Sequence, residues 1–443
     1  MRQMRSPLVL AFALALSAAA CIVEQDLGSH GALDGTGVSS GAGVGGGIGV
    51  GGGASVASST VSGASSSSSS SSSSGATVCD GGVCREGQAL ATGEFHTCVI
   101  VVGGVKCWGY DGWGLLGDDS KTGSVADVYQ PVDAKGLSGV TAISAGGDHT
   151  CALTSSGGVK CWGHNIYGYL GNGSLLEARV PGDVVGLASG AAAVSAAESW
   201  TCALTVGGGV RCWGFNTSNK LLSDDDSTVS AVPVDRAGLS SGVAAVAAGG
   251  HHGCAVLSTG GIVCWGNNDN GQLGDGTWTT SVMPTAVTGL SSGMSVVVAG
   301  AAHTCALTSS GGVKCWGQNA KGQLGNDSTA DSRVPVDVIG LSSGVASISA
   351  GTAQTCVVTT GGGVKCWGEN SHGKLGNGVP GNSRVPVDVV GLSSGAVAVS
   401  TAVEHTCALL ASGGVMCWGY NYHYQLGNNT LASSAVPVAV MGL

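Results

Sequence analysis

The stretch HTCALTSSGGVKCWG, from His149 to Gly163, recurs with small changes along most of the chain. Its Cys-Trp-Gly end appears seven times, at steps of 54, 51, 52, 51, 51 and 51 residues. The seven cysteines of this motif are Cys107, Cys161, Cys212, Cys264, Cys315, Cys366 and Cys417. Seven units of about 51 residues account for the whole of 87–443, so this segment is one repeat domain.

Each unit holds four short apolar runs, of the types VASISA, TCAL, GVKCW and VPVDV, separated by Gly, Ser and Asn. Such runs are typical of strands joined by turns, and proline in the fourth run indicates an edge strand. Four-stranded units repeated seven times predict an all-β fold, a seven-bladed β-propeller of four-stranded blades. A linear solenoid is disfavoured because neither terminal unit resembles a polar cap. We expect the last run, Val436–Leu443, to pair with the first unit and close the ring inside one blade.

Each unit also carries a second cysteine upstream of Cys-Trp-Gly. In the second unit a hairpin centred on Ser156 places Cys151 opposite Cys161, at the separation of about 4.5–5.5 Å that a disulfide tolerates. The chain's 17 cysteines then divide into seven hairpin pairs, one pair ahead of the repeats, and Cys21. The predicted disulfides are Cys98–Cys107, Cys151–Cys161, Cys202–Cys212, Cys254–Cys264, Cys305–Cys315, Cys356–Cys366, Cys407–Cys417 and Cys79–Cys84. Paired cysteines indicate an exported chain.

The spacing of these cysteines is unlike that of zinc sites, so neither a metal nor a cofactor is expected. A histidine stands two positions before the first cysteine in five units, at His96, His149, His252, His303 and His405. Trp200 and Gln354 replace it in the other two units. We therefore expect this position to make a structural hydrogen bond of the repeat.

The N-terminal part predicts export. A basic start, the apolar run Leu8–Leu16 and small residues up to Cys21 indicate a signal peptide over 1–20. Cys21 resembles the lipidated first residue of bacterial lipoproteins, and the alternative is an ordinary cleaved signal. Residues 21–78 read as a disordered Gly/Ser-rich tether, residues 79–86 as a short Cys-bridged segment, and residues 87–443 as the propeller. The expected location is extracytoplasmic, either as an outer-membrane lipoprotein or as a secreted protein.

Composition excludes several functions. Only 10% of residues are charged, against about 25% in ordinary soluble proteins. The net charge of −10 argues against nucleic acid as a partner. No nucleophile elbow or metalloprotease motif is present, so we expect no enzymatic activity. The segment Asn267–Trp278 resembles a calcium loop, but it is the fourth unit's version of a loop that every unit carries.

That loop, which follows Trp-Gly, differs between units in an informative way. It is polar in units four to six and rich in aromatic residues in units seven, one and two, which become neighbours once the ring closes. Aromatic residues of this kind dominate binding hot spots, so we predict one contiguous binding rim. The alternative is that the rings cover core between blades. The candidate residues are Tyr110, Trp113, Tyr167, Tyr169, Tyr420, Tyr422 and Tyr424.

The segment HTCALTSSGGVKCWGQNAKGQLG, from His303 to Gly325, resembles the repeat of the regulator of chromosome condensation family. The resemblance covers Gly87–Leu443 and implies a seven-bladed propeller. The founding eukaryotic member exchanges nucleotide on a nuclear GTPase and docks on nucleosomes, but no residue here matches a motif for that exchange. The paired cysteines depart from the eukaryotic pattern. What the resemblance implies for function is a rigid protein-binding platform.

Three functions follow as hypotheses. The favoured one is a surface-tethered, monomeric scaffold that engages an unknown extracytoplasmic protein through the aromatic rim and meets the membrane only through its lipid. The second is a propeller that binds or processes a surface glycan, although the acidic residues near the rim, Asp111 and Glu404 among them, form no clear catalytic pair. The third is a structural spacer.

Overall fold

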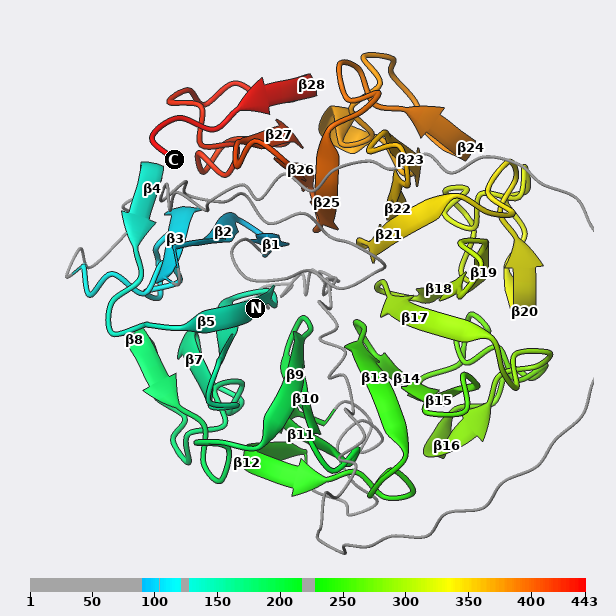
Figure 1. Cartoon of the computed structure of the whole chain (residues 1–443), viewed down its shortest axis with the longest axis horizontal. Coiled ribbons are helices and arrows are strands. Elements are labelled where there is room, and N and C mark those ends of the chain that lie inside the picture. Colours follow the sequence, from blue (N-terminus) through cyan, green and yellow to red (C-terminus); the bar gives the residue numbers. More distant parts are fainter. Residues whose placement is uncertain (1–89, 103, 121–126, 217–227) are drawn as a thin grey trace, which may run out of the picture. The chain divides into compact units, whose positions relative to one another are not determined.

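The computed structural model describes residues 90–102, 104–120, 127–216 and 228–443. Within them, seven four-stranded antiparallel sheets form the blades of a propeller (Figure 1). The predicted all-β propeller of seven four-stranded blades is confirmed. The predicted signal peptide, the tether, the pair Cys79–Cys84 and Cys21 lie outside the described residues.

The strands follow one another from the inside of each blade to its outer edge. Blades 1 to 4 consist of β1 (Leu90–Thr92), β2 (His96–Val101), β3 (Gly104–Gly109), β4 (Val128–Asp133), β5 (Val140–Ala145), β6 (His149–Thr154), β7 (Val159–Gly163), β8 (Ala178–Asp183), β9 (Ala191–Ala196), β10 (Trp200–Thr205), β11 (Val210–Phe215), β12 (Val229–Asp235), β13 (Val243–Ala248), β14 (His252–Leu257), β15 (Ile262–Gly266) and β16 (Ser281–Ala286). Blades 5 to 7 consist of β17 (Met294–Ala299), β18 (His303–Thr308), β19 (Val313–Gly317), β20 (Ser332–Asp337), β21 (Val345–Ala350), β22 (Gln354–Thr359), β23 (Val364–Gly368), β24 (Ser383–Asp388), β25 (Ala396–Thr401), β26 (His405–Leu410), β27 (Val415–Gly419) and β28 (Ser434–Ala439). A short 3-10 turn, η2 (Ser371–Gly373), lies in blade 6.

Burial decreases outward across each blade. The second strand is buried along nearly its whole length, whereas the fourth strand is only partly buried. Every fourth strand contains the proline of the VPVDV-type run, such as Pro335 in β20, and it pairs with one neighbour only. Proline lacks the N–H that a further strand would require, so the predicted edge position is confirmed.

The expected closure of the ring is wrong. The last strand, β28, pairs with β27 of its own repeat, with Cys417 opposite Val438, and not with the first unit. Each blade is therefore one continuous sequence repeat. Blade 1 meets blade 7 through side chains instead: the Thr92 hydroxyl lies 2.8 Å from the Ser400 hydroxyl, and Trp108 donates its ring N–H to the Gln425 carbonyl at 2.9 Å.

The seven hairpin cysteine pairs all form disulfides. In blade 2, Cys151 and Cys161 are opposed in the strand register, with 4.1 Å between their Cα atoms. The other six are Cys98–Cys107, Cys202–Cys212, Cys254–Cys264, Cys305–Cys315, Cys356–Cys366 and Cys407–Cys417. The disulfides are buried, so each is part of the core as well as a cross-link.

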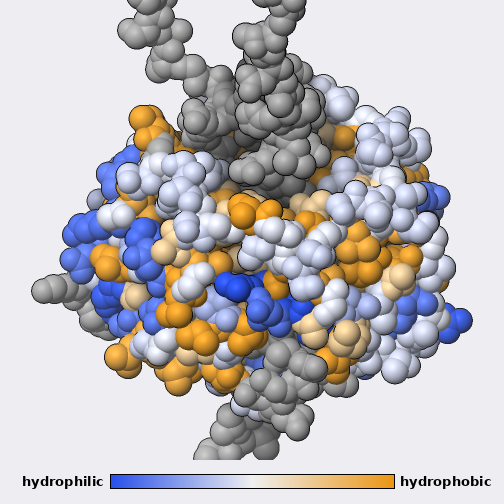
Figure 2. All heavy atoms as spheres, turned by 60° about the horizontal axis from the view of Figure 1, so that its bottom comes forward, coloured by the Kyte–Doolittle hydropathy of each residue, from blue (hydrophilic) through white to orange (hydrophobic). Residues whose placement is uncertain are grey.

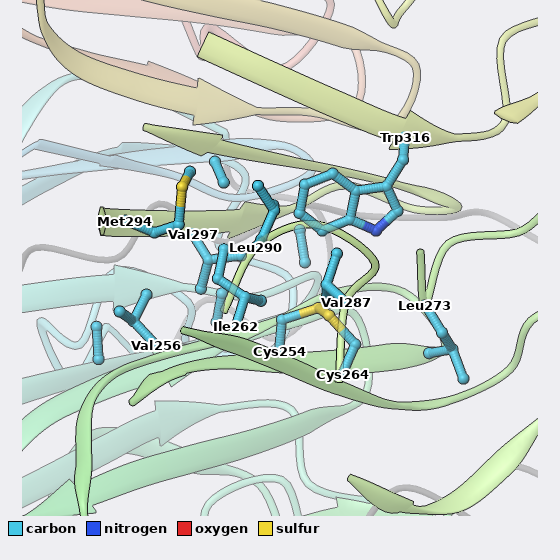
Figure 3. Packing of buried hydrophobic residues seen from close by; sticks show 14 residues of the cluster. Cys254, Val256, Ile262, Cys264, Leu273, Val287, Leu290, Met294, Val297 and Trp316 are labelled. Carbon is cyan, nitrogen blue, oxygen red and sulfur yellow. A yellow bond between two sulfur atoms is a disulfide. The ribbon is translucent and has the colours of Figure 1, made fainter. Parts of the chain in front are cut away.

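The core consists of seven clusters, one at each interface between neighbouring blades. In each cluster the disulfide of one blade lies beside the tryptophan of the next. Figure 3 shows this at the junction of blades 4 and 5, where Cys254–Cys264 and Trp316 share a cluster with Met294 and Val297. Ring closure uses the same arrangement, because Trp108 of blade 1 belongs to one cluster with Cys407 and Cys417 of blade 7.

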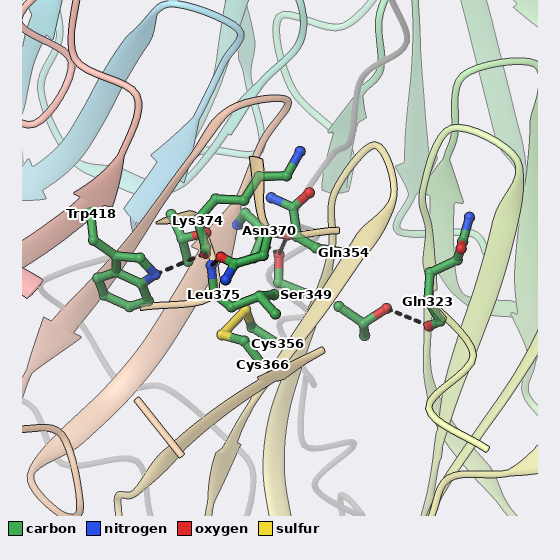
Figure 4. Close-up of a disulfide and its surroundings, with 12 residues drawn as sticks. Gln323, Ser349, Gln354, Cys356, Cys366, Asn370, Lys374, Leu375 and Trp418 are labelled. Atoms are coloured by element: carbon green, nitrogen blue, oxygen red, sulfur yellow. Dashed lines mark hydrogen bonds between the residues drawn. A yellow bond between two sulfur atoms is a disulfide. The ribbon is translucent and has the colours of Figure 1, made fainter. Parts of the chain in front are cut away.

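The tryptophan also ties neighbouring blades together by a hydrogen bond. Its ring N–H donates to a backbone carbonyl in the preceding blade's loop, as Trp418 does to Lys374 at 2.9 Å (Figure 4). A threonine hydroxyl of the same blade, that of Thr406, donates to the same carbonyl at 3.0 Å. A buried indole N–H requires an acceptor, so this loop and the next blade fix each other's position.

The histidine before each hairpin cysteine has the structural role that the sequence predicts. The Nε2 atom of His303 lies 3.0 Å from the Thr355 hydroxyl of the next blade, and the other four histidines make the equivalent bond. Where the histidine is replaced, Trp200 donates to the Gly249 carbonyl and Gln354 to the Ala402 carbonyl. Burial lowers the pKa of His303 to about 4, so the ring is held neutral.

Candidate functional site

The aromatic loops share one face of the ring with the turns that join the first and second strands of each blade. The glycine of Trp-Gly makes this approach possible. Gly163 has a φ of 108°, and a Cβ there would lie 2.7 Å from the Asp148 carbonyl. The next residue, His164, donates its backbone N–H to that carbonyl at 2.8 Å. We call the turns between the first and second strands of the blades the inner turns. In blades 1, 2, 3 and 7 they hold Glu94, Asp148, Glu198 and Glu404.

In blades 1, 2 and 4 to 7, an Asn or Asp two positions after the glycine of Trp-Gly folds the loop. In blade 6 the Asn370 side chain accepts a hydrogen bond from the Leu375 N–H at 2.9 Å and donates to the Val379 carbonyl at 2.6 Å (Figure 4). In blade 1 Asp111 takes this place, accepting from the Leu116 N–H at 3.1 Å. In blade 4 the Asn268 side chain accepts from the Leu273 N–H and donates to the Thr277 carbonyl. The segment that resembled a calcium loop is therefore held by amide hydrogen bonds.

Most of the predicted aromatic residues form a continuous series of ring contacts across blades 1 to 3. Tyr110 contacts Trp113 edge-on at 5.6 Å between ring centroids, and Trp113 stacks on His164 at 4.6 Å. His164 contacts Tyr169 at 5.9 Å. Tyr169 contacts Tyr167 at 5.9 Å, and Tyr167 contacts Phe215, the last residue of β11 in blade 3, at 4.7 Å.

The series extends into blade 7 as well. His423 contacts Tyr110 at 5.1 Å and Phe95 at 4.9 Å. We refer to the complete set as the aromatic arc: Phe95, Tyr110, Trp113, His164, Tyr167, Tyr169, Phe215 and His423.

The remaining three predicted tyrosines lie apart from these contacts. Tyr420 and Tyr422 contact each other at 5.1 Å, and Tyr420 contacts His372 of blade 6 at 4.8 Å. Tyr424 instead faces the outer strand β4, where its ring lies 6.0 Å from that of Tyr129.

Exposure separates these rings into two groups. Tyr422 is 63% exposed and Tyr167 38%, so both can contact a partner. Tyr169 is 6% exposed and stacks over the buried His149 at 5.4 Å. Tyr169 therefore supports the other rings from below.

Four carboxylates accompany the aromatic residues on the inner turns of blades 7, 1, 2 and 3. The turns are joined laterally, because Glu94 donates its backbone N–H to the Gly147 carbonyl, and Gly147 donates to Ala197, each at 3.3 Å. Burial is the largest cause that raises the pKa of Glu94, to about 8. The negative charges of Asp148, Glu198 and Glu404 act in the same direction.

The other carboxylates are perturbed in the same way. Burial raises the pKa of Asp148 to about 6. Burial, and then the charge of Asp148, raises the pKa of Glu198 to about 7. The phenol of Tyr110 also has a raised pKa, first through burial and then through the charge of Asp148. The carboxylates and the aromatic arc therefore share one electrostatic environment.

Within the described residues, the salt bridges of these four carboxylates involve Lys374 of blade 6 and two histidines. The buried ammonium of Lys374 lies 4.0 Å from Glu404 and 2.7 Å from Glu369. His372 lies 3.1 Å from Glu404, and His164 lies 3.9 Å from Asp148. Among the described residues, no group of three His, Cys, Asp or Glu side chains could hold a metal ion, and no helix is long and apolar enough to cross a membrane.

Sequence reasoning placed Glu404 near the rim but did not single out the other three inner-turn carboxylates, nor the rings of Phe95, His164, Phe215 and His423. The signal was nevertheless present, because the same departure from the repeat that marks the aromatic loops also marks the inner turns. Blades 4 to 6 have residues without a carboxylate there, His251, Ala302 and Ala353.

Family models match most of the repeat domain. A model described as RCC1-like domain matches residues 176–443, and two described as Regulator of chromosome condensation (RCC1) repeat match residues 140–168 and 103–153.

Individual proteins of known name are similar over comparable lengths. The chain is 31% identical over 348 residues to the ultraviolet-B receptor UVR8 of Arabidopsis thaliana, covering 76% of this chain and 78% of the receptor. It is 31% identical over 349 residues to the human E3 ubiquitin-protein ligase HERC2, covering 75% of this chain but 7% of the ligase. The solved structure of yeast RCC1 (Prp20) with Kap60 matches with a TM-score of 0.65 and 23% identity, over 80% of this chain and 84% of that chain. With more than half of its length matched by the first model and with seven four-stranded blades built from seven repeats, the chain belongs to the regulator of chromosome condensation (RCC1) repeat family.

Proposed function

We propose that this chain is a non-enzymatic, extracytoplasmic scaffold that binds a protein partner through the aromatic arc together with Tyr420 and Tyr422. The observation that carries the proposal is the continuous series of ring contacts across four consecutive blades. Propellers of this family serve as rigid platforms for protein interaction. The yeast relative is itself seen in complex with another protein, Kap60.

Rigid aromatic side chains suit this use because they offer large contact area at a small cost in conformational entropy. The arc is held from below by Tyr169 and by the loop hydrogen bonds, so little ordering remains to be done on binding. The outer wall of the propeller offers less. On the side at the lower edge of Figure 1, hydrophobic, weakly polar and strongly hydrophilic residues are interspersed, and no single kind of side chain gathers there (Figure 2).

Seven buried disulfides indicate folding in an oxidising compartment outside the cytoplasm. In our proposal the protein reaches the bacterial envelope through its signal peptide. It is then held there by a lipid on Cys21 and a tether over 21–78, or it is released.

The test is capture of partners from envelope and culture-supernatant fractions by the full oxidised chain. The double variant Tyr422→Ala/Trp113→Ala is compared with Trp278→Ala, which removes an exposed tryptophan from the blade-4 loop outside the arc. We expect a protein that the wild type and Trp278→Ala both capture and that the double variant binds at least about tenfold more weakly once it is purified.

Other outcomes decide between the alternatives. Equal capture by the double variant, with its disulfides and melting temperature intact, would contradict the proposal. Capture of glycan without protein would favour the carbohydrate-binding alternative, because exposed aromatic rings also stack on sugars.

A further inference from the structure

The inner turns divide the ring electrostatically into two unequal parts. Blades 7, 1, 2 and 3 place the carboxylates of Glu404, Glu94, Asp148 and Glu198 there, whereas the inner turns of blades 4 to 6 carry none. The carboxylate-bearing blades are also the ones that carry the aromatic arc. Two chemically different features therefore coincide on one sector of one face.

Two of these carboxylates lack a counter-charge. Glu404 has Lys374 and His372, and Asp148 has His164, but no salt bridge within the described residues involves Glu94 or Glu198. Glu94 is only 5% exposed, and its Oε1 atom is buried without a hydrogen-bond partner. The Oε2 atom of Glu198 is buried and unpartnered in the same way.

Leaving a buried carboxylate oxygen without a hydrogen-bond donor is unfavourable. Backbone hydrogen bonds join the turn of Asp148 to those of Glu94 and Glu198, and the charge of Asp148 contributes to the raised pKa of both, so the unpartnered oxygens belong to one cluster. A donor brought by a ligand would remove this cost. The described side chains do not converge as a metal site does, which favours a donor larger than a metal ion.

The aromatic arc indicates what kind of donor fits. Carboxylates offer charge-assisted hydrogen bonds to guanidinium and ammonium groups, and the faces of Tyr and Trp attract the same cations. His164 lies 3.9 Å from the Asp148 carboxylate and contacts the rings of Trp113 and Tyr169 at 4.6 and 5.9 Å, so the aromatic arc adjoins the carboxylates.

We propose that this sector binds a positively charged segment of the protein partner and seats one of its Arg or Lys side chains among Glu94, Asp148 and Glu198, beside the aromatic arc. The inference rests on the proposed function and names the class of partner. A protein segment is favoured over a small free cation because the aromatic contacts continue across blades 7, 1, 2 and 3, well beyond what one small molecule covers.

The raised pKa values agree with this arrangement. Glu94, with a pKa of about 8, holds a proton at neutral pH that a bound cation would displace. The groups that face Glu94 are Asp148, Glu198 and Glu404, and Glu404 is partly balanced by Lys374 and His372. Binding of an arginine peptide should therefore strengthen as the pH rises from about 6 to about 8.

The test uses short random peptides displayed on phage, selected on the oxidised full chain near pH 8. The variant Glu94→Gln/Asp148→Asn/Glu198→Gln neutralises the cluster without changing side-chain size. The matched control Asp183→Asn/Asp337→Asn/Asp388→Asn removes three carboxylates from exposed ion pairs on outer strands.

We expect selected peptides to be enriched in Arg or Lys on the wild type and on the control, and the enrichment to disappear on the cluster variant. A selected peptide synthesised with citrulline for arginine should bind at least about tenfold more weakly. Free spermidine and N-acetyl-arginine amide are measured beside it and should bind far more weakly than the peptide.

Three results would overturn the inference: no peptide selected above background, selected peptides without cationic enrichment, or unchanged enrichment on the cluster variant. Spermidine binding as tightly as the peptide would assign the cluster to small cations and also contradict the proposal. The capture experiment with Tyr422→Ala/Trp113→Ala is a separate test of protein binding. Failure of the inference about a cationic segment would therefore not contradict the proposed protein-binding function.

Discussion

At the scale of the residue, two positions that lie close together in the repeat behave differently because their surroundings differ. His303 and its four equivalents are buried in hydrogen bonds to a neighbouring threonine and are held neutral by burial, with the pKa of His303 lowered to about 4. Glu94, only two positions before His96, is buried without such a bond, and its pKa is raised to about 8. The Nδ1 atoms of the five histidines are also buried without a partner, so what distinguishes Glu94 is the combination of an unpartnered oxygen with a raised pKa.

The stability of the folded chain should depend on pH in a way that reflects the burial of Glu94. The pKa of Glu94 is about 8 in the folded state against 4.5 unfolded, so between these values the folded chain holds a proton that the unfolded chain has released. The contribution of Glu94 to stability is therefore fully present below about pH 4.5 and is lost as the pH rises through about 8. Glu94→Gln should match the wild type near pH 4.5 and melt at a higher temperature near pH 8.5, measured by scanning calorimetry.

The control for this prediction is Asp337→Asn, which removes an exposed carboxylate lying 2.6 Å from Lys314. Because an exposed ion pair contributes about 1 kcal/mol at most, its effect should be small at both pH values. A melting temperature of Glu94→Gln that shows no gain at the higher pH would contradict the burial of this carboxylate in the ionised form.

At the scale of the element, the disulfide hairpin is the unit that sequence reasoning predicts best. The two cysteines are separated by 10 positions in six blades and by 9 in blade 1, so the register that opposes Cys151 to Cys161 follows from counting residues, and it is confirmed. Ring closure is less predictable, because an outer strand could pair within its own repeat or with the first. The tryptophan contacts at every interface, which counting cannot reveal, make the exchange of a strand unnecessary.

Removing one disulfide should lower the free energy of unfolding by an amount that can be estimated from the loop it closes. The Cys254–Cys264 bond closes a loop of 10 residues, for which the chain-entropy estimate is about 3 kcal/mol. Cys254→Ala/Cys264→Ala should lower the free energy of unfolding by roughly 3–5 kcal/mol, because both sulfurs are buried against Trp316 and leave a cavity. Urea unfolding monitored by tryptophan fluorescence measures the change.

The wild type under reductant is the control for the disulfide variant. Because the disulfides are buried, dithiothreitol should leave them intact in the native protein and reduce them only when urea is added. An unfolding free energy that the double substitution leaves unchanged would mean that packing alone stabilises the blade.

At the scale of the whole molecule, the propeller is regular and the candidate site is where regularity ends. The number of blades and the number of strands follow from the period of the sequence, and the aromatic loops are detectable as departures from it. The placement of Tyr424 against Tyr129 and the depth of Tyr169 are not, because both depend on loop conformation. Glu404 could be placed near the rim from the sequence, but its grouping with Glu94, Asp148 and Glu198 could not, because each carboxylate lies in its own repeat and only the ring brings them together.

Because blades 1 and 7 meet through side-chain contacts, we predict that the chain can be circularly permuted between blades. The link from β24 to β25 runs through Gly-Leu-Ser-Ser-Gly at 391–395, and the chain after β28 ends with Gly442 and Leu443. Joining Leu443 to Gly87 through Ser-Ser-Gly therefore copies a native connection. A circular permutant opened between Ser240 and Ser241, in an exposed turn between blades 3 and 4, keeps every disulfide hairpin and every interface intact.

We expect this permutant to fold with all seven hairpin disulfides and to melt within a few degrees of the wild type, as judged by mass spectrometry after alkylation and by calorimetry. A second permutant, opened between Thr259 and Gly260, cuts the hairpin that joins Cys254 to Cys264 and should be clearly less stable. If both permutants lost stability equally, the junction of blades 1 and 7 would depend on the native ends of the chain. If only the second is weakened, any blade can stand first in the ring, as expected when Trp108 and its equivalents make the same contact at each interface.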